Sequence, residues 1–110
     1  MAQNFRRYTS NAVGTSPAAV YTANSYDAIV GISLSNILGT AINVSCYIND
    51  GTNDIYLVKD APLPVGSSLQ VLDGGAKLVL DGTTSDALKV ISDTASSCDV
   101  WVSAVDAIST

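Results

Sequence analysis

The chain has 110 residues, the length of a single domain, and contains no apolar run near the ~20 residues of a membrane-spanning helix. Charged residues make up only 14% and the net charge is −5, so the bulk charge favours neither nucleic acid nor an anionic membrane as a partner. The chain has no His and no Glu, which excludes catalytic triads built on Ser or Cys with His. We therefore expect no enzymatic activity and no cofactor.

Residues 1–17 show no periodicity and are rich in Asn, Ser, Thr and Gly. Both arginines of the chain, Arg6 and Arg7, lie here, whereas all ten Asp follow Pro17. The segment is predicted to be an extended arm that becomes ordered only against another molecule, beside a domain of residues 18–110. The positive charge of this segment fits two interpretations. The segment is either a solvated terminus or a basic arm that lies on an acidic neighbouring subunit. The segment lacks the apolar core of a signal peptide, so synthesis in the cytoplasm is expected.

From residue 18 onward, apolar and polar residues alternate with the two-residue period of β-strands. A short strand is predicted at 18–22, and the strand at 27–36 places Val30, Ile32 and Leu34 on one face. In the next strand, Ile42, Val44, Cys46 and Ile48 point one way, and Asn43, Ser45, Tyr47 and Asn49 the other. The turn at 49–53 predicts a hairpin with the strand at 54–59.

The second half of the chain begins with two prolines in 61–66, which exclude an interior strand and predict a crossover between sheets. A second hairpin is predicted from 69–72, a turn at 73–75, and 77–80. The strand at 87–92 places Leu88 and Val90 on one face. The last strand, 98–106, is predicted to point Cys98, Val100 and Val102 inward and Asp99, Trp101 and Ser103 outward.

These elements amount to about eight short antiparallel strands with turn signals every 8–12 residues and no helix. All acidic residues are Asp, and several precede Gly, as is typical of tight turns. The sequence therefore predicts an all-β fold, a β-sandwich with an extended N-terminal arm. A jelly roll is one way to connect its strands.

Two groups of residues contain side chains that can bind metals. Asn49, Asp50, Asn53 and Asp54 lie in one loop but do not match the spacing of an EF-hand, and Asn and Asp are ordinary turn formers. Cys46 and Cys98 are too far apart in sequence for a C-x-x-C metal site. No metal is predicted, and the cysteines are expected to be buried thiols, with a disulfide as the alternative.

Aromatic residues on the outward faces of strands are candidates for contacts with other subunits. Trp101 is predicted to point outward, and Tyr47 and Tyr56 lie opposite, or at the edge of, the apolar faces of their strands. A loop or the arm covering Trp101 is one alternative, and stacking of the aromatics on sugars is another. With the arm, the predicted assembly residues are Phe5, Arg6, Arg7, Tyr8, Tyr47, Tyr56 and Trp101.

Residues 21–106 resemble small virion proteins of tailed bacteriophages. The resemblance is carried by Tyr21-Thr22, Val30-Gly31-Ile32, the segment from Leu57 to Leu69 (LVKDAPLPVGSSL) and Leu88 to Asp93 (LKVISD). It implies a repeated component of the particle, such as a head decoration (cement) subunit, often a β-rich trimer with an extended arm, or a small neck or tail protein. It implies no catalytic residues.

The leading hypothesis is a capsid decoration protein located in the virion and made in the host cytoplasm. Its expected partners are other virion proteins, the major capsid protein or tail and neck proteins, and further copies of itself, with a trimer favoured. Neither nucleic acid nor a membrane is expected as a partner. A tail, neck or fibre-associated subunit is the first alternative, and a carbohydrate-binding module is the second.

Overall fold

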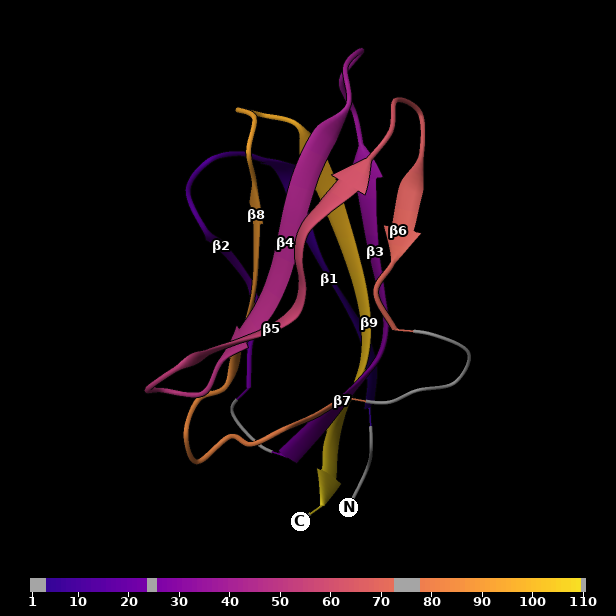
Figure 1. Cartoon of the computed structure of the whole chain (residues 1–110). Helices are drawn as coiled ribbons and strands as arrows, with labels where there is room; N and C mark the ends of the chain where they lie inside the picture. Colours follow the sequence, from indigo (N-terminus) through magenta and orange to yellow (C-terminus); the bar gives the residue numbers. More distant parts are fainter. Residues whose placement is uncertain (1–3, 24–25, 73–77, 110) are drawn as a thin grey trace.

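A computed structural model of the protein describes residues 4–23, 26–72 and 78–109; for residues 4 and 106–109 only the backbone is described. Within these ranges the chain forms nine β-strands in two antiparallel sheets that pack face to face, and no segment is a helix able to cross a bilayer. Figure 1 shows the two layers, with both ends of the chain at the same end of the sandwich. The predicted all-β sandwich is confirmed.

The chain passes repeatedly between the sheets, and only β4–β5 and β6–β7 are consecutive strands of the same sheet. Sheet A contains, in spatial order, β1 (Asn4–Val13), β9 (Cys98–Ser109), β3 (Tyr26–Asn36), and then β6 (Ser68–Gln70) with β7 (Leu78–Leu80), which both pair with β3. Sheet B contains β2 (Ala18–Thr22), β8 (Ala87–Ser92), β4 (Ile42–Asn49) and β5 (Asp54–Leu63). If β6 and β7 are taken as one interrupted strand, eight strands remain, in the spatial orders 1-8-3-6 and 2-7-4-5. This is the connectivity of a jelly roll.

The predicted alternation holds in the central strands. In β4, Ile42, Val44, Cys46 and Ile48 are buried in the core between the sheets. In β9, Cys98, Val100 and Val102 are buried there while Trp101 is 52% exposed. In β8, Leu88 and Val90 are both buried. The two-residue period alone was sufficient to predict which side chains point into the core, because these strands run regularly through the middle of a sheet.

Strand β3 departs from the predicted alternation at Val30. The register between β3 and β9 shifts between Ile29 and Gly31, so Val30 occupies a β-bulge. Val30 is 38% exposed, and Ile29 takes the inward position that the sequence had given to Val30. The prediction was correct for Ile32 and Leu34, which lie beyond the bulge and are buried.

The predicted N-terminal arm is corrected by β1. Residues 4–13 pair antiparallel with β9 of the same chain, from Asn4 opposite Asp106 to Val13 opposite Cys98. Val13 is buried in the core. The segment lacks a clear two-residue period because the register shifts between Ser10 and Val13, where Ala12 adopts a positive φ of 55°. It is the edge strand of sheet A.

The turn-based predictions had mixed outcomes. The hairpin of β4 and β5 is confirmed, and the chain then crosses from sheet B to sheet A. Pro62 lies within β5, which tolerates it because β5 is an edge strand. The second hairpin is wrong: β6 and β7 both run antiparallel to β3, on its two halves, so they point the same way and cannot pair as a hairpin. The turn predicted at 73–75 lies outside the described residues.

A polar pair lies inside the sandwich near the start of β3. Asp27 is fully buried, and Tyr21 of β2 donates a hydrogen bond from its hydroxyl to an Asp27 carboxylate oxygen. Tyr8 of β1 stacks on Tyr21, with ring centroids 4.2 Å apart. The pair therefore links the two sheets through a buried hydrogen bond.

Replacing Tyr21 with Phe tests this link. The variant leaves a buried carboxylate without one of its donors, which we expect to lower the free energy of unfolding by about 1.5–3 kcal/mol. Urea unfolding followed by circular dichroism measures the loss. Tyr26→Phe is the matched control, since Tyr26 is 41% exposed, and it is expected to change stability little. Equal effects from the two substitutions would contradict a structural role for this hydrogen bond.

Candidate functional site: the outer face of sheet A

Three of the predicted assembly residues lie together on the outer face of sheet A. Pairing of β1 with β9 places Phe5 opposite Val105, Arg7 opposite Ser103, and Thr9 opposite Trp101. The Arg7 guanidinium lies over the Trp101 ring, 5.4 Å from its centroid, in a cation–π contact. Phe5 is 85% exposed. Phe5, Arg7 and Trp101 thus form a continuous part of one surface.

The remaining predicted residues lie elsewhere. Tyr8 is opposite the buried Val102 and packs inside against Tyr21, so it is corrected from a partner-binding residue to a core contact. Arg6 is exposed and lies opposite Ala104, one position out of phase with the outward residues of β1. The sequence predicted residues 1–17 to be a single arm. The pairing of β1 with β9 instead directs alternate side chains of β1 to the two faces of sheet A.

Tyr47 and Tyr56 belong to sheet B and lie on the opposite face of the sandwich. They are opposite each other on β4 and β5, with ring centroids 4.9 Å apart, and the Lys59 amine lies 4.7 Å from the Tyr56 ring centroid. Tyr47 is only 5% exposed because its neighbours cover it, which corrects its prediction as an exposed aromatic. Burial raises the pKa of Tyr47, with smaller contributions from Asp54 and Tyr56. Tyr56 is 42% exposed.

The outer face of sheet A also carries an apolar row that the sequence analysis missed. Four residues lie in register across β1, β9, β3 and β7, namely Phe5, Val105, Ala28 and Val79. Val79 is 62% exposed, while Ala28 and Val105 are buried between their neighbours without belonging to the core. A sequence signal existed: Leu78, Val79 and Leu80 are consecutive apolar residues, so in a strand at least one must face outward.

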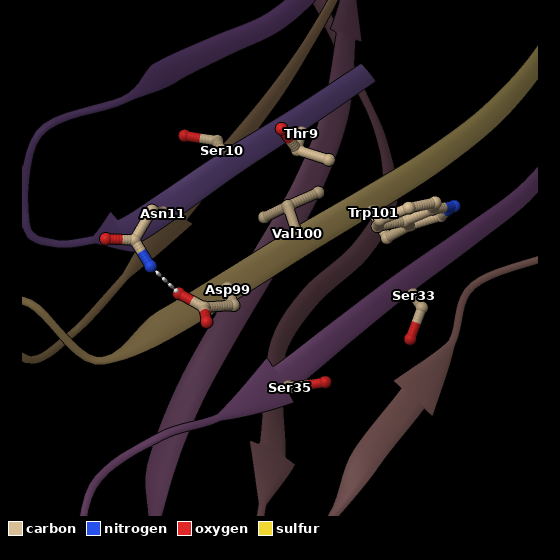
Figure 2. A pocket seen from close by; sticks show the side chains of 8 residues that line it. All are labelled: Thr9, Ser10, Asn11, Ser33, Ser35, Asp99, Val100 and Trp101. Carbon is tan, nitrogen blue, oxygen red and sulfur yellow. Dashed lines mark hydrogen bonds between the residues drawn. The ribbon is translucent and has the colours of Figure 1, made fainter. Parts of the chain in front are cut away.

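A groove lined by both polar and apolar groups lies beside this row, and we call it the Trp101 groove. It has a volume of about 390 Å³ and is lined by Thr9, Ser10, Asn11, Ser33, Ser35, Asp99, Val100 and Trp101. Figure 2 shows the indole at one end of the groove and Asp99 near the other, with residues of β1 along one side and Ser33 and Ser35 of β3 along the other. Only its aromatic end was identified from the sequence.

Asp99 fixes the shape of the groove at the β1 bulge. Its Oδ1 accepts hydrogen bonds from Asn11 Nδ2 at 2.8 Å and from the Ala12 backbone N–H at 2.9 Å. Ala12 is the residue with positive φ, so these contacts hold the strained turn of β1 against β9. The side chain of Asp99 therefore positions one wall of the groove.

The described residues contain no cluster of three or more His, Cys, Asp or Glu side chains that could hold a metal. In the 49–54 loop, Asp50 Oδ1 instead accepts the backbone N–H groups of Thr52 and Asn53 at 3.0 and 2.8 Å. These bonds lower the pKa of Asp50. The loop thus uses its oxygens in turn formation.

Cys46 and Cys98 are both free and buried. Burial raises the pKa of Cys46 to about 12, with a contribution from Cys98, and raises that of Cys98 to about 11. The thiols thus resemble small apolar core residues rather than nucleophiles.

Thiol labelling tests this burial. At pH 8 we expect Ellman's reagent to modify both cysteines slowly in the native protein and rapidly in urea. As pH rises above 9, the unfolded thiols lose their protons while the native ones retain them. Stability is therefore expected to fall from pH 9 towards pH 12. Rapid labelling of the native protein at pH 8 would contradict this account.

Comparisons with other proteins do not assign a family. No protein-family model matches the chain, and no curated protein is similar to it in sequence. The apolar row and the Trp101 groove on the outer face of sheet A are therefore the candidate functional features of the chain.

Proposed function

We propose that this protein is a structural subunit that assembles with other protein subunits through the outer face of sheet A. We place it in the particle of a tailed bacteriophage, as a head decoration protein. The observation that carries the assembly role is the apolar row, with Phe5 85% and Val79 62% exposed at its two ends. Large apolar side chains left in water on one face of a sheet are typical of a surface that a partner covers.

The geometry of the row suits a protein partner. Its four residues lie across adjacent strands of one sheet, and Tyr26 and Val30, 41% and 38% exposed, also lie on β3. A flat sheet face can pack against another sheet or helix over its whole width. Burying such area contributes ~25 cal/mol per Å², and repetition over many identical copies would stabilise a shell.

Composition and fold are consistent with this role. Charged residues are 14% of the chain, which leaves a weakly charged surface suited to close contact with neighbours. Jelly rolls occur in viral capsid proteins and also in lectins, so the fold is only an analogy. The particle setting rests on the resemblance of several segments to phage virion proteins. A trimer is the expected oligomer, and a neck or tail position is the alternative location.

Copy number in purified particles tests the proposal. Particles are purified on a density gradient from cells that produce this protein, and quantitative mass spectrometry gives its number per particle. Hundreds of copies support a shell protein, whereas six or twelve place it at the neck or tail. Absence of the protein from intact particles would contradict a virion role.

Val79→Asp tests the docking surface. A charge at the exposed end of the apolar row is expected to lower affinity for particles at least tenfold, about 1.4 kcal/mol, without unfolding the exposed strand β7. Co-sedimentation of the purified variant with particles measures this. Val65→Asp is the matched control, because Val65 is 55% exposed in the segment between β5 and β6 and lies outside the row. Equal binding by both variants would remove the apolar row as the contact.

A further inference from the structure

The Trp101 groove differs in chemistry from the apolar row, although both lie on sheet A. Its lining contains hydroxyl, amide and carboxylate groups, the side chain of Val100 and one aromatic ring, and the cationic Arg7 lies over that ring without belonging to the lining. Its volume of about 390 Å³ falls at the lower end of the ~300–1,000 Å³ that small-molecule sites occupy. An apolar peptide would leave the hydroxyl, amide and carboxylate groups of the lining without partners. The groove therefore fits a small polar ligand.

Several polar groups in the groove are available to such a ligand. The hydroxyls of Thr9, Ser33 and Ser35 line the groove, and each can both donate and accept a hydrogen bond. Asp99 uses Oδ1 for Asn11 and Ala12, which leaves Oδ2 as an acceptor. Ser33 lies directly opposite Trp101, and Ser35 directly opposite Asp99. Donors and acceptors thus lie along one wall of the groove, within reach of the ring.

Trp101 provides the apolar part of the site. The indole is 52% exposed, and the Arg7 guanidinium over the ring restricts its motion. A restricted aromatic side chain loses little conformational entropy when a ligand stacks on it. A pyranose ring matches this arrangement, because it presents C–H groups on its faces and hydroxyls around its rim.

We propose that the Trp101 groove binds a neutral saccharide of one or two rings. The sugar stacks on the exposed indole surface while its rim hydroxyls bond to Ser33, Ser35 and Asp99 Oδ2. A neutral sugar is favoured over an anionic one, because the Asp99 carboxylate and the net charge of −5 repel negative groups. This site is separate from the assembly role.

The position of the groove allows both activities on one face. Along β1, Phe5 of the apolar row and Thr9 of the groove are four residues apart, about 13 Å in an extended strand. A saccharide in the groove therefore does not have to occupy the row. Variants of each surface serve as controls for the other.

The test is binding of the full-length protein to an array of immobilised neutral and acidic glycans, followed by calorimetric titration with the neutral glycan that gives the strongest signal. We expect binding to neutral glycans, a loss of affinity of at least tenfold in Trp101→Ala, and weaker binding in Ser33→Gln, which fills the groove. Val79→Asp is expected to bind normally. Because Trp101 is the only tryptophan, quenching or enhancement of its fluorescence gives a second readout of the wild-type protein.

Three results would overturn the proposal. These are no binding to any neutral glycan on the array, binding confined to acidic glycans, and binding that Trp101→Ala leaves intact. Circular dichroism of each variant confirms that it is folded. If Val79→Asp loses particle binding and retains glycan binding, the two roles are separate. A negative result in the particle test does not contradict the saccharide site, and a negative result in the glycan test does not contradict the assembly role.

Discussion

Removal of residues 1–13 is expected to unfold the domain, not to release a folded body. The deletion removes β1, so one whole edge of β9 loses its hydrogen-bonded partner. It also removes Val13 from the core and Tyr8 from its contact with Tyr21. Large buried side chains each contribute about 2–5 kcal/mol, and a domain is stable by only about 5–15 kcal/mol in total. The combined loss is comparable to the whole stability.

Circular dichroism and urea unfolding of the truncated protein measure this effect. The matched control removes only residues 1–3, which leaves all of β1 in place. We expect the control to show a cooperative transition near that of the full chain, and the longer deletion to show none. A longer deletion that unfolds cooperatively at an unchanged midpoint would restore the interpretation of this segment as a separate arm.

Leu34→Ala is expected to destabilise the domain strongly. Leu34 is fully buried on β3, the strand of sheet A that lies between β9 and β6. Truncation removes apolar contacts and leaves a cavity that the two sheets can close only in part. The expected loss is about 2–5 kcal/mol. Urea unfolding gives the difference, and thermal unfolding should show a lower Tm.

Ile37→Ala is the control for Leu34→Ala. Ile37 is an aliphatic residue three positions away, but it is 45% exposed just beyond the end of β3. We expect its truncation to cost well under half as much as that of Leu34. Equal costs would show that Leu34 does not lie in the tightly packed part of the core.

The candidate site was only partly predictable. Trp101 was identified because successive side chains of a regular strand point to opposite faces. Since Val100 and Val102 point inward, Trp101 between them must point outward. Val79 was missed because three adjacent apolar residues give no preferred face until β7 pairs with β3. Ser35 and Asp99 were not recognised as site residues, because they approach each other only across the pairing of β3 with β9.

The sequence by itself determined the all-β class, the central strands and the outward position of Trp101, because a two-residue period acts within one strand. Tertiary structure decided that residues 4–13 complete sheet A, that Val30 bulges outward, and that Tyr47 is covered. These features depend on which strands pair and in what register. Such pairings join residues up to about a hundred positions apart, as Asn4 with Asp106 shows, and no local pattern encodes them.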